Sequence, residues 1–291
     1  MKRKIKYQGG ITKLLCQTKA SWNKRKFIKG VLHKQKVSLH NRKHVPFEII
    51  SFSGSHGFED QILSIMSMVH YAGTPPKWTI YSDGTYTNEQ KSVFKTLFSF
   101  VEVKNWNALH QLDNIKVYQE LLRVNVLAKK LNVILCHPHQ NQTLFIDSDI
   151  IFYKNIPYYL NSHLLQQGLW YVPDTIAEIG NHFNQARESF YPLNSGLLVI
   201  NNTFDSRDIF LYLERLNNNF CYFSEQLAFE YAFTKQGANI LDPRQFIIDS
   251  SDQFDFAMGY HPGKIAMRHY TGPVRHKIWQ MGWKWHFNSD N

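Results

Sequence analysis

Residues 143–152 read TLFIDSDIIF, two short apolar runs around a pair of aspartates one residue apart. The first run predicts a buried strand of a parallel sheet. Side chains two residues apart in an extended chain point the same way, so Asp147 and Asp149 converge while Ser148 faces away. Two convergent carboxylates suit a hard divalent cation such as Mg2+ or Mn2+. The stretch predicts a metal site at the end of this strand, although a polar turn has the same pattern.

Predicted strands and helices alternate through the first half of the chain. Apolar runs predict strands at residues 47–52, 78–81 and 100–103, ahead of the strand at 143–146. Helical spacing predicts helices that begin near residues 59, 87 and 113, the last a long one reaching residue 131. Thr87 and Gln90 form a capping-box pattern at the second of these. The alternation predicts an α/β fold, with a mostly parallel central sheet flanked by helices.

Polar residues follow three of these predicted strands. Ser53 and Gly54 follow the first, Asp83 follows the second, and Ser148 lies within the aspartate pair. Ligands of such sheets bind at the carboxyl ends of the strands, so these residues are candidates for binding a nucleotide. The chain contains no Gly-x-Gly-x-x-Gly and no Walker A pattern, which argues against a dinucleotide dehydrogenase and a P-loop NTPase.

The second half of the chain adds two polar motifs beside apolar segments. In PLNSGLLVIN, Asn194 and Ser195 can hydrogen-bond sugar hydroxyls, and Gly196 lets a ligand approach the backbone. Glu225 and Gln226 open a predicted helix. Each motif also fits an ordinary structural role, a turn before a core strand and a helix N-terminus with an acid in its first turn.

The C-terminal segment RHYTGPVRHKIW, residues 268–279, concentrates cationic side chains. The imidazole of His269 can complete a metal site with two aspartates, and Arg275 or Lys277 can neutralise a leaving diphosphate. The alternative is a structural histidine beside solvated cations.

The order of these motifs, D-x-D, N-S-G, E-Q and then H-x-x-G with basic residues and Trp, resembles the GT-A nucleotide-sugar glycosyltransferases. The family 8-like branch, with a tail of the form H-x-x-G-x-x-K-P-W, is the most similar. The resemblance covers residues 47–285. It implies a Rossmann-like sheet, a divalent metal that is usually Mn2+, and transfer from a nucleotide-diphosphate sugar, here expected to be a UDP-sugar. A glycan or lipid-linked acceptor, such as a bacterial-type surface glycan, follows by analogy alone.

The resemblance carries over residue by residue. It implies three metal ligands, Asp147, Asp149 and His269. It implies a turn that contacts the donor sugar, Asn194, Ser195 and Gly196. It implies a pair near the reacting carbon, Glu225 and Gln226. The tail departs from the family pattern, because Gly272 is in place but Arg275 occupies the expected Lys position and Lys277 comes two residues late.

The chemistry that these residues would perform leaves two choices open. The metal would act as a Lewis acid on the diphosphate, with Arg275 or Lys277 as a second cation on the departing oxygen. Glu225 could be the general base of an inverting transfer, or Gln226 could steady the sugar during a retaining one. The family 8-like resemblance favours retention.

Basic residues are concentrated at the N-terminus. Of 33 Lys and Arg, 14 lie in residues 1–47, which contain no acid, and the remaining 19 face 23 acidic residues. We predict a basic, helical extension over residues 1–46 and one GT-A domain over residues 47–291. Such an extension attracts lipid headgroups, nucleic acid or an acidic polymer, or is simply solvated. We expect an anionic membrane surface rather than nucleic acid, and we expect donor hydrolysis to survive removal of residues 1–40.

Two other functions compete with glycosyl transfer. A sugar nucleotidyltransferase would need a Gly-rich loop with Lys or Arg after the first strand, and residues 53–57, SGSHG, have neither cation. A non-catalytic protein that binds nucleic acid or a membrane would explain the basic extension but not the Asp147, Asn194 and His269 motifs.

Cysteine usage and hydropathy indicate the compartment. The three cysteines, Cys16, Cys136 and Cys221, are widely spaced, which favours a reducing compartment over a disulfide framework. No apolar run approaches transmembrane length, and residues 11–15 are too short for a signal-peptide core. We expect a cytoplasmic protein, peripheral to the inner face of a membrane.

Overall fold

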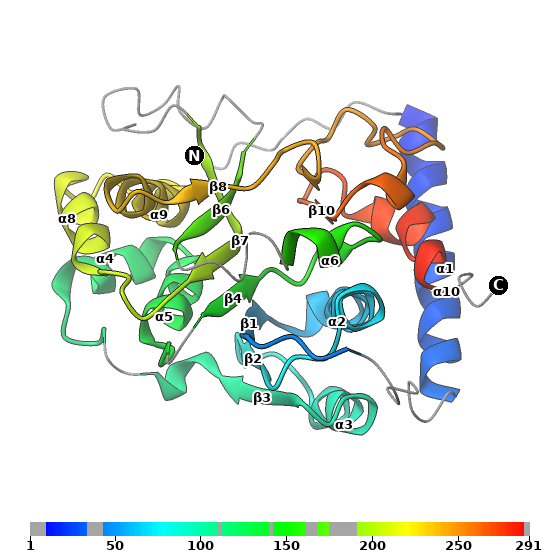
Figure 1. The fold of residues 1–291 in the computed structure, drawn as a ribbon, viewed down its shortest axis with the longest axis horizontal. Coiled ribbons are helices and arrows are strands. Elements are labelled where there is room, and N and C mark those ends of the chain that lie inside the picture. Colours follow the sequence, from blue (N-terminus) through cyan, green and yellow to red (C-terminus); the bar gives the residue numbers. More distant parts are fainter. Residues whose placement is uncertain are drawn as a thin grey trace.

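The computed structural model describes residues 10–33, 43–109, 112–139, 142–160, 168–174 and 191–287. Its centre is a seven-stranded sheet of order β3-β2-β1-β4-β7-β6-β8 (Figure 1). The strands are β1 Glu48–Ser53, β2 Trp78–Ser82, β3 Val101–Asn105, β4 Thr143–Ile146, β6 Trp170–Pro173, β7 Leu193–Ile200 and β8 Asn239–Ile240. The pairs β3–β2, β2–β1, β1–β4 and β6–β8 are parallel, whereas β7 runs antiparallel to both β4 and β6. The mostly parallel sheet is confirmed.

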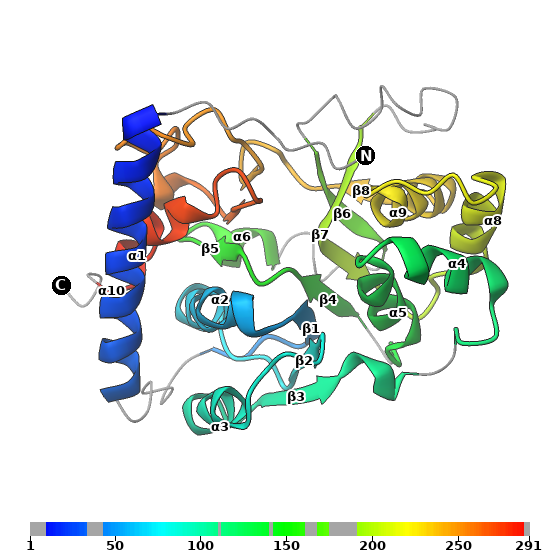
Figure 2. The same cartoon turned by 180° about the vertical axis from the view of Figure 1, so that it is seen from behind.

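Helices cover both faces of this sheet (Figures 1 and 2). They are α1 Gly10–His33, α2 Phe58–Tyr71, α3 Asn88–Leu97, α4 Lys116–Val124, α5 Ala128–Cys136, α6 Ile156–Tyr159, α8 Arg207–Arg215, α9 Ser224–Lys235 and α10 Lys284–Phe287. Successive strand residues face opposite sides, so Ile49 packs in the core that includes α2 and Ile50 in the core that includes α5. The capping box of Thr87 and Gln90 is present at α3.

The single long helix predicted from residue 113 is wrong, because the chain breaks into α4 and α5 at Asn125. The Asn125 side chain takes over local backbone bonds, accepting from the Leu127 N–H at 2.8 Å. Its amide also donates to the carbonyls of Cys221 and Tyr222, which belong to the segment before α9. A polar side chain that offers the backbone other partners favours a helix end over a helix interior.

A second, three-stranded sheet lies at the carboxyl end of β4. It consists of β5 Ile150–Phe152, β10 Met267–His269 and β9 Phe246–Ile247, in the order β5-β10-β9. The strand β10 runs antiparallel to β5, with His269 opposite Ile150. This register brings the C-terminal segment beside the Asp147-Ser148-Asp149 turn. The chain then continues into the helical turn η5 Ile278–Gly282.

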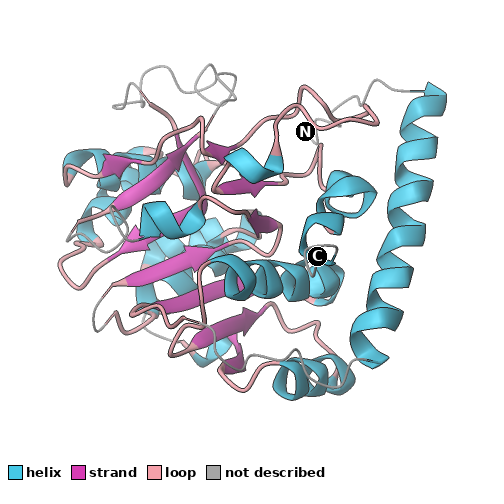
Figure 3. Ribbon diagram, turned by 45° about the vertical axis from the view of Figure 1, so that its right-hand side comes forward, coloured by secondary structure: helices cyan, strands magenta, loops and turns pink. Residues whose placement is uncertain are grey.

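Helix α1 forms one edge of the molecule, beside the C-terminal elements (Figure 3). Its residues Cys16, Ala20, Asn23 and Phe27, spaced four, three and four apart, are buried. The Phe27 ring centroid lies 4.9 Å from that of Trp279. The predicted helix is therefore present, but it shares a core with the rest of the chain, and this packing argues against removing residues 1–40 without effect.

None of the described helices is long and apolar enough to cross a membrane. Residues 1–9 and 34–42 of the predicted basic extension lie outside the described residues.

Candidate active site

Three side chains that can bind a metal converge at the carboxyl end of β4. One ligand atom each of Asp147, Asp149 and His269 lies within 4.8 Å of the other two. His269 Nε2 is 3.1 Å from Asp149 Oδ1 and 3.8 Å from Asp147 Oδ2. The two aspartates follow the end of β4, and His269 is the last residue of β10, which pairs with β5. The three predicted metal ligands therefore lie together.

A hydrogen-bond chain sets the tautomer of His269. Asn194 Nδ2 donates to Asp174 Oδ2 at 3.0 Å, which fixes the amide orientation because a carboxylate only accepts. Asn194 Oδ1 then faces the Gly196 N–H and His269 Nδ1, each at 2.9 Å. Nδ1 must carry the proton of a neutral imidazole, so the Nε2 lone pair faces the aspartates. In that neutral form Nε2 and the two carboxylates all offer lone pairs toward one point, a donor set that fits a divalent metal.

Gly196 is required by this arrangement. A Cβ at this position would lie 2.3 Å from His269 Cε1 and 2.8 Å from Asn194 Oδ1. The space that we expected a ligand to use is thus filled by the imidazole. Glycine lets the His269 ring pack directly against β7.

A second cation lies beside Asp149. Arg275 Nη2 is 2.8 Å from Asp149 Oδ2. Burial by itself raises the pKa of Asp149, but the charge of Arg275 is the main opposing influence, and the pKa lies below its usual range. Asp149 is therefore held as a carboxylate, the form that binds a metal.

Lys277 does not reach this site. Its ammonium is buried and donates to the carbonyl oxygens of Asp255 at 2.9 Å and Ala257 at 2.6 Å. Its expected role beside a diphosphate is therefore replaced by a structural one. Of the two predicted cations, Arg275 alone contacts the aspartate cluster in the part of the chain that the structure describes. Gly272 lies exposed in the turn before it.

Lys130 is a cation of the site that the sequence analysis missed. Its Nζ, projecting from α5, lies 3.1 Å from both Asp147 Oδ2 and Ser195 Oγ. Burial lowers the pKa of Lys130, but Asp147 and Glu225 more than offset this, so the amine stays charged. The available signal was a lysine inside the apolar helix AKKLNVILC, which comes just before the D-x-D strand.

The predicted pair Glu225 and Gln226 lies beside the residues that surround the metal ligands. Glu225 is fully buried at the start of α9, and its Oε2 accepts from Ser195 Oγ at 3.1 Å. Burial raises the pKa of Glu225 to about 7, although Lys130 opposes the shift. Gln226 Nε2 donates to Asp174 Oδ2 at 3.2 Å. Asp174 thus joins Asn194 and Gln226, and no motif in the sequence pointed to it.

The residues after β1 and β2 that were predicted to bind a nucleotide differ in how accessible they are to a ligand. The Asp83 carboxylate fills the space over Gly54, where a Cβ would lie 2.3 Å from its oxygens. Ser53 Oγ is buried against Gln61 and Tyr86 at 3.0 and 2.8 Å. The expected nucleotide contact through the Ser53 hydroxyl is therefore replaced by core hydrogen bonds.

Ser148 lies at the same carboxyl end of the sheet, after β4. Its Oγ lies 2.9 Å from the position of a Cβ on Gly57, so it packs against the loop after β1.

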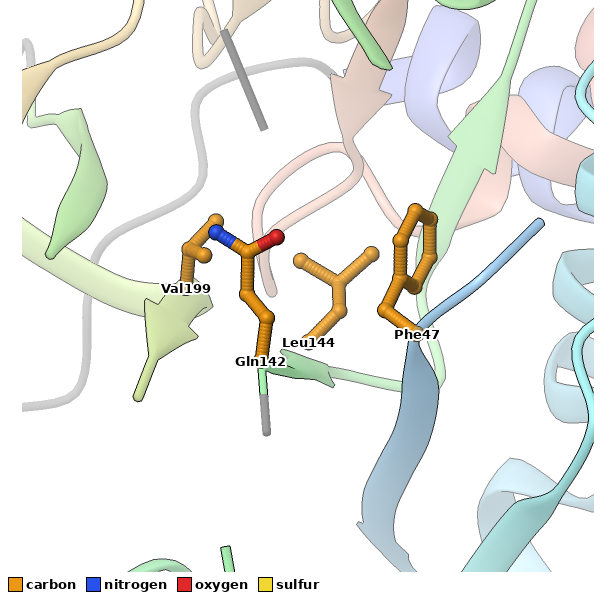
Figure 4. Close-up of a pocket in the computed structure, with 4 residues that line it drawn as sticks. All are labelled: Phe47, Gln142, Leu144 and Val199. Carbon is orange, nitrogen blue, oxygen red and sulfur yellow. The ribbon is translucent and has the colours of Figure 1, made fainter. Parts of the chain in front are cut away.

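One shallow hollow lies away from this cluster (Figure 4). It is lined by Phe47, Gln142, Leu144 and Val199, around the amino ends of β1 and β4. Because Asp147 follows the opposite end of β4, this hollow is not part of the candidate active site.

Several solved glycosyltransferases resemble this structure. The galactosyltransferase LgtC, solved with donor and acceptor sugar analogues, has a TM-score of 0.54 at 12% identity, over 82% of this chain and 100% of that chain. The bifunctional glycosyltransferase WbbM gives 0.55 at 13%, over 84% and 50% of the two chains. Apo GlyE of Streptococcus pneumoniae TIGR4 gives 0.50 at 14%, over 83% and 62%.

The expected GT-A fold is confirmed by these structural matches. No protein-family model matches the chain, and no curated protein matches it in sequence.

Proposed function

We propose that this protein is a metal-dependent glycosyltransferase. It moves a sugar from a nucleotide-diphosphate donor, a UDP-sugar, to a glycan or lipid-linked acceptor. The observation that carries the proposal is the convergence of Asp147, Asp149 and His269, with Nε2 of His269 turned toward the two carboxylates. The GT-A fold supports it, and LgtC was solved with donor and acceptor sugar analogues.

Asp147, Asp149 and His269 would hold the metal. An imidazole nitrogen among carboxylate oxygens favours Mn2+ over Mg2+, which prefers oxygen ligands alone. When bound, the ion would supply Lewis-acid stabilisation of the diphosphate leaving group. Two carboxylates leave a divalent ion close to neutral, so a diphosphate needs a further cation nearby. Arg275 meets this need, because its side chain contacts Asp149 and is still 44% exposed.

The residues around Asp174 would hold the donor sugar. Asn194 and Gln226 both donate to the Asp174 carboxylate, which fixes three side chains with hydrogen-bonding capacity beside the metal ligands. Glu225 lies behind Ser195 and is fully buried, whereas a general base must reach the acceptor hydroxyl. This geometry favours a retaining transfer in which Gln226 steadies the sugar, and no general-base role for Glu225.

A thermal-shift titration tests this function. We expect Mn2+ with UDP or a UDP-sugar to raise the melting temperature by several degrees, since a ligand that binds only the folded state stabilises it. Asp149→Asn should abolish the Mn2+-dependent part of the shift, and the exposed Asp113→Asn should keep it. Slow donor hydrolysis should follow the same pattern. A wild-type protein that shows neither a Mn2+-dependent shift nor hydrolysis with any nucleotide sugar contradicts the proposal.

A further inference from the structure

Helix α1 presents a second face that none of the described residues covers. The four residues of its inner face, from Cys16 to Phe27, pack against the C-terminal segment. Among the residues that the structure describes, twelve large apolar side chains are exposed, and four of them lie on this one helix. They are Ile11 at 78%, Leu14 at 64%, Leu15 at 53% and Trp22 at 63% exposure. The concentration is too high for scattered surface residues, which need no explanation when single.

The charge of α1 is of one sign. Its sequence holds six Lys or Arg and no acid. At about 100° per residue, Leu14, Trp22, Arg25 and Lys29 project from the side opposite the buried stripe. Lys26 Nζ lies 5.5 Å from the centre of the Trp22 ring, so cations and apolar groups are interleaved. Figure 3 shows that α1 stands at the edge of the molecule.

We propose that the outer face of α1 docks on an anionic membrane surface. The apolar side chains would enter the headgroup region, as in interfacial helices, and the cations would pair with acidic headgroups. Nucleic acid and acidic polymers match the cations, but neither gives Ile11, Leu14 and Trp22 an apolar environment. Exposed Phe256 lies at the flank of α1, with Lys19 Nζ 5.5 Å from its ring centre. Membrane docking does not depend on the proposed function; if both hold, the acceptor is carried by a membrane lipid.

Vesicle co-sedimentation of the full chain tests the docking face. The vesicles are phosphatidylcholine alone and phosphatidylcholine with about one third phosphatidylglycerol. We expect binding to the anionic vesicles that weakens with added salt, and little binding to the neutral ones. Leu14→Ser with Trp22→Ser, and separately Arg25→Gln with Lys29→Gln, should each weaken binding about ten-fold or more. The matched control Leu211→Ser removes an exposed leucine from α8 and should bind like wild type.

The serine double variant and a comparison with RNA distinguish a membrane surface from other anionic partners. If the serine variant binds anionic vesicles as wild type does, the apolar groups are not used and the proposal is wrong. If wild type binds double-stranded RNA more tightly than the vesicles, the cations serve nucleic acid instead. Thermal melting of each variant checks the fold, and donor binding in solution, measured in parallel, reports on the proposed function independently.

The inner side of α1 carries a second, independent inference, which starts from a buried carboxylate. Asp60, in the first turn of α2, is 2% exposed. Trp279 Nε1 donates to Asp60 Oδ1 at 2.6 Å. Arg275 Nε lies 3.5 Å from Oδ2, and Lys24 Nζ of α1 lies 3.7 Å from Oδ1. Asp60 therefore joins α1 and the C-terminal segment to the arginine that contacts Asp149.

We infer that Asp60 is a positioning residue for Arg275. The guanidinium is held between two carboxylates, Asp149 on Nη2 at 2.8 Å and Asp60 on Nε. An arginine side chain has many rotamers, and a second anchor restricts it to those that reach the metal site. Helix α1 supports the anchor through Lys24, and Asn23 Nδ2 donates to the Trp279 carbonyl at 2.8 Å. This inference rests on the proposed function, because Arg275 acts there on the diphosphate.

A double-mutant cycle separates positioning from a structural role. We expect Asp60→Asn to lower kcat about ten-fold with little change in the KM for donor, and Arg275→Gln to lower it about a hundred-fold. If Asp60 acts through Arg275, the double variant is no slower than Arg275→Gln alone. Independent effects that multiply overturn the inference, because a loss of packing would add to the loss of Arg275.

The cycle is repeated on the affinity for UDP with Mn2+, which needs no turnover. If wild type binds UDP but the effects multiply, the positioning role fails and the proposed function stands. If wild type neither binds nor turns over a nucleotide sugar, both fail. Lys95→Gln, an exposed change on α3, is the control and should leave both measurements unchanged.

Discussion

Replacing Glu225 with Gln should stabilise the folded protein at neutral and higher pH. The carboxyl group is fully buried, with Ser195 Oγ on Oε2 and, among the described residues, no hydrogen-bond partner on Oε1. Burial raises its pKa from the ordinary 4.5 to about 7, against the opposing charge of Lys130 and with a further rise from Asp147. Gln has the same shape and no charge to bury.

The sign and size follow from proton linkage. Below about pH 4.5 the carboxyl is protonated in both the folded and unfolded chains and costs nothing. Between 4.5 and about 7 the unfolded chain releases the proton while the folded one keeps it, so the free energy of unfolding falls as pH rises. One pH unit corresponds to about 1.4 kcal/mol, which gives a full cost of about 3 kcal/mol above pH 7. Glu225→Gln should remove most of this cost.

Urea denaturation followed by tryptophan fluorescence measures the effect. The buffers contain a chelator, because a metal at Asp147 and Asp149 would change the local charge. We expect Glu225→Gln and wild type to be similarly stable near pH 5, and the variant to be more stable by up to about 3 kcal/mol near pH 8. Exposed Glu214→Gln serves as the control and should show no such pH-dependent difference. A difference between Glu225→Gln and wild type that stays constant with pH would refute the reasoning.

Three further substitutions test the metal cluster. Gly196→Ala should push the His269 ring aside and lower Mn2+ affinity about ten-fold or more, measured by calorimetry, whereas Gly30→Ala, whose added Cβ meets nothing within 4 Å, should not. Asn194→Leu should lower Mn2+ affinity about ten-fold by releasing the His269 tautomer, and unchanged affinity would contradict the hydrogen-bond argument. Lys130→Met should destabilise the protein by about 3 kcal/mol in urea, because Asp147 and Glu225 lose their buried cation; a variant as stable as wild type would contradict this.

Local patterns determined much of this fold. The apolar run that ends in Asp147-Ser148-Asp149 is a buried strand followed by a turn, as its residues predict. The strands near residues 48, 78 and 101 and the capping box at Thr87 also depend on neighbours a few positions away. Side-chain alternation and helical spacing are properties of short segments, so the sequence is sufficient to predict them.

Residue chemistry also identified the candidate metal ligands, but it could not show that they lie close together in the fold. His269 is 120 residues from Asp149 in the chain, and the pairing of β10 with β5 places it within 3.1 Å. Nothing local distinguished Arg275 from Lys277, yet one contacts Asp149 and the other is buried against carbonyl oxygens.

Only the tertiary structure decided which polar groups meet. Lys130, Asp174 and Asp60 belong to no sequence motif, and each gains its role from partners on other elements. The position of α1 was also decided by the tertiary structure. Its basic composition suggested an extension separate from the domain, but Phe27 packs on Trp279. Secondary structure follows from bonds between near neighbours, whereas the partner of a buried charge is set by packing between distant segments, because an unpaired charge there costs too much to remain.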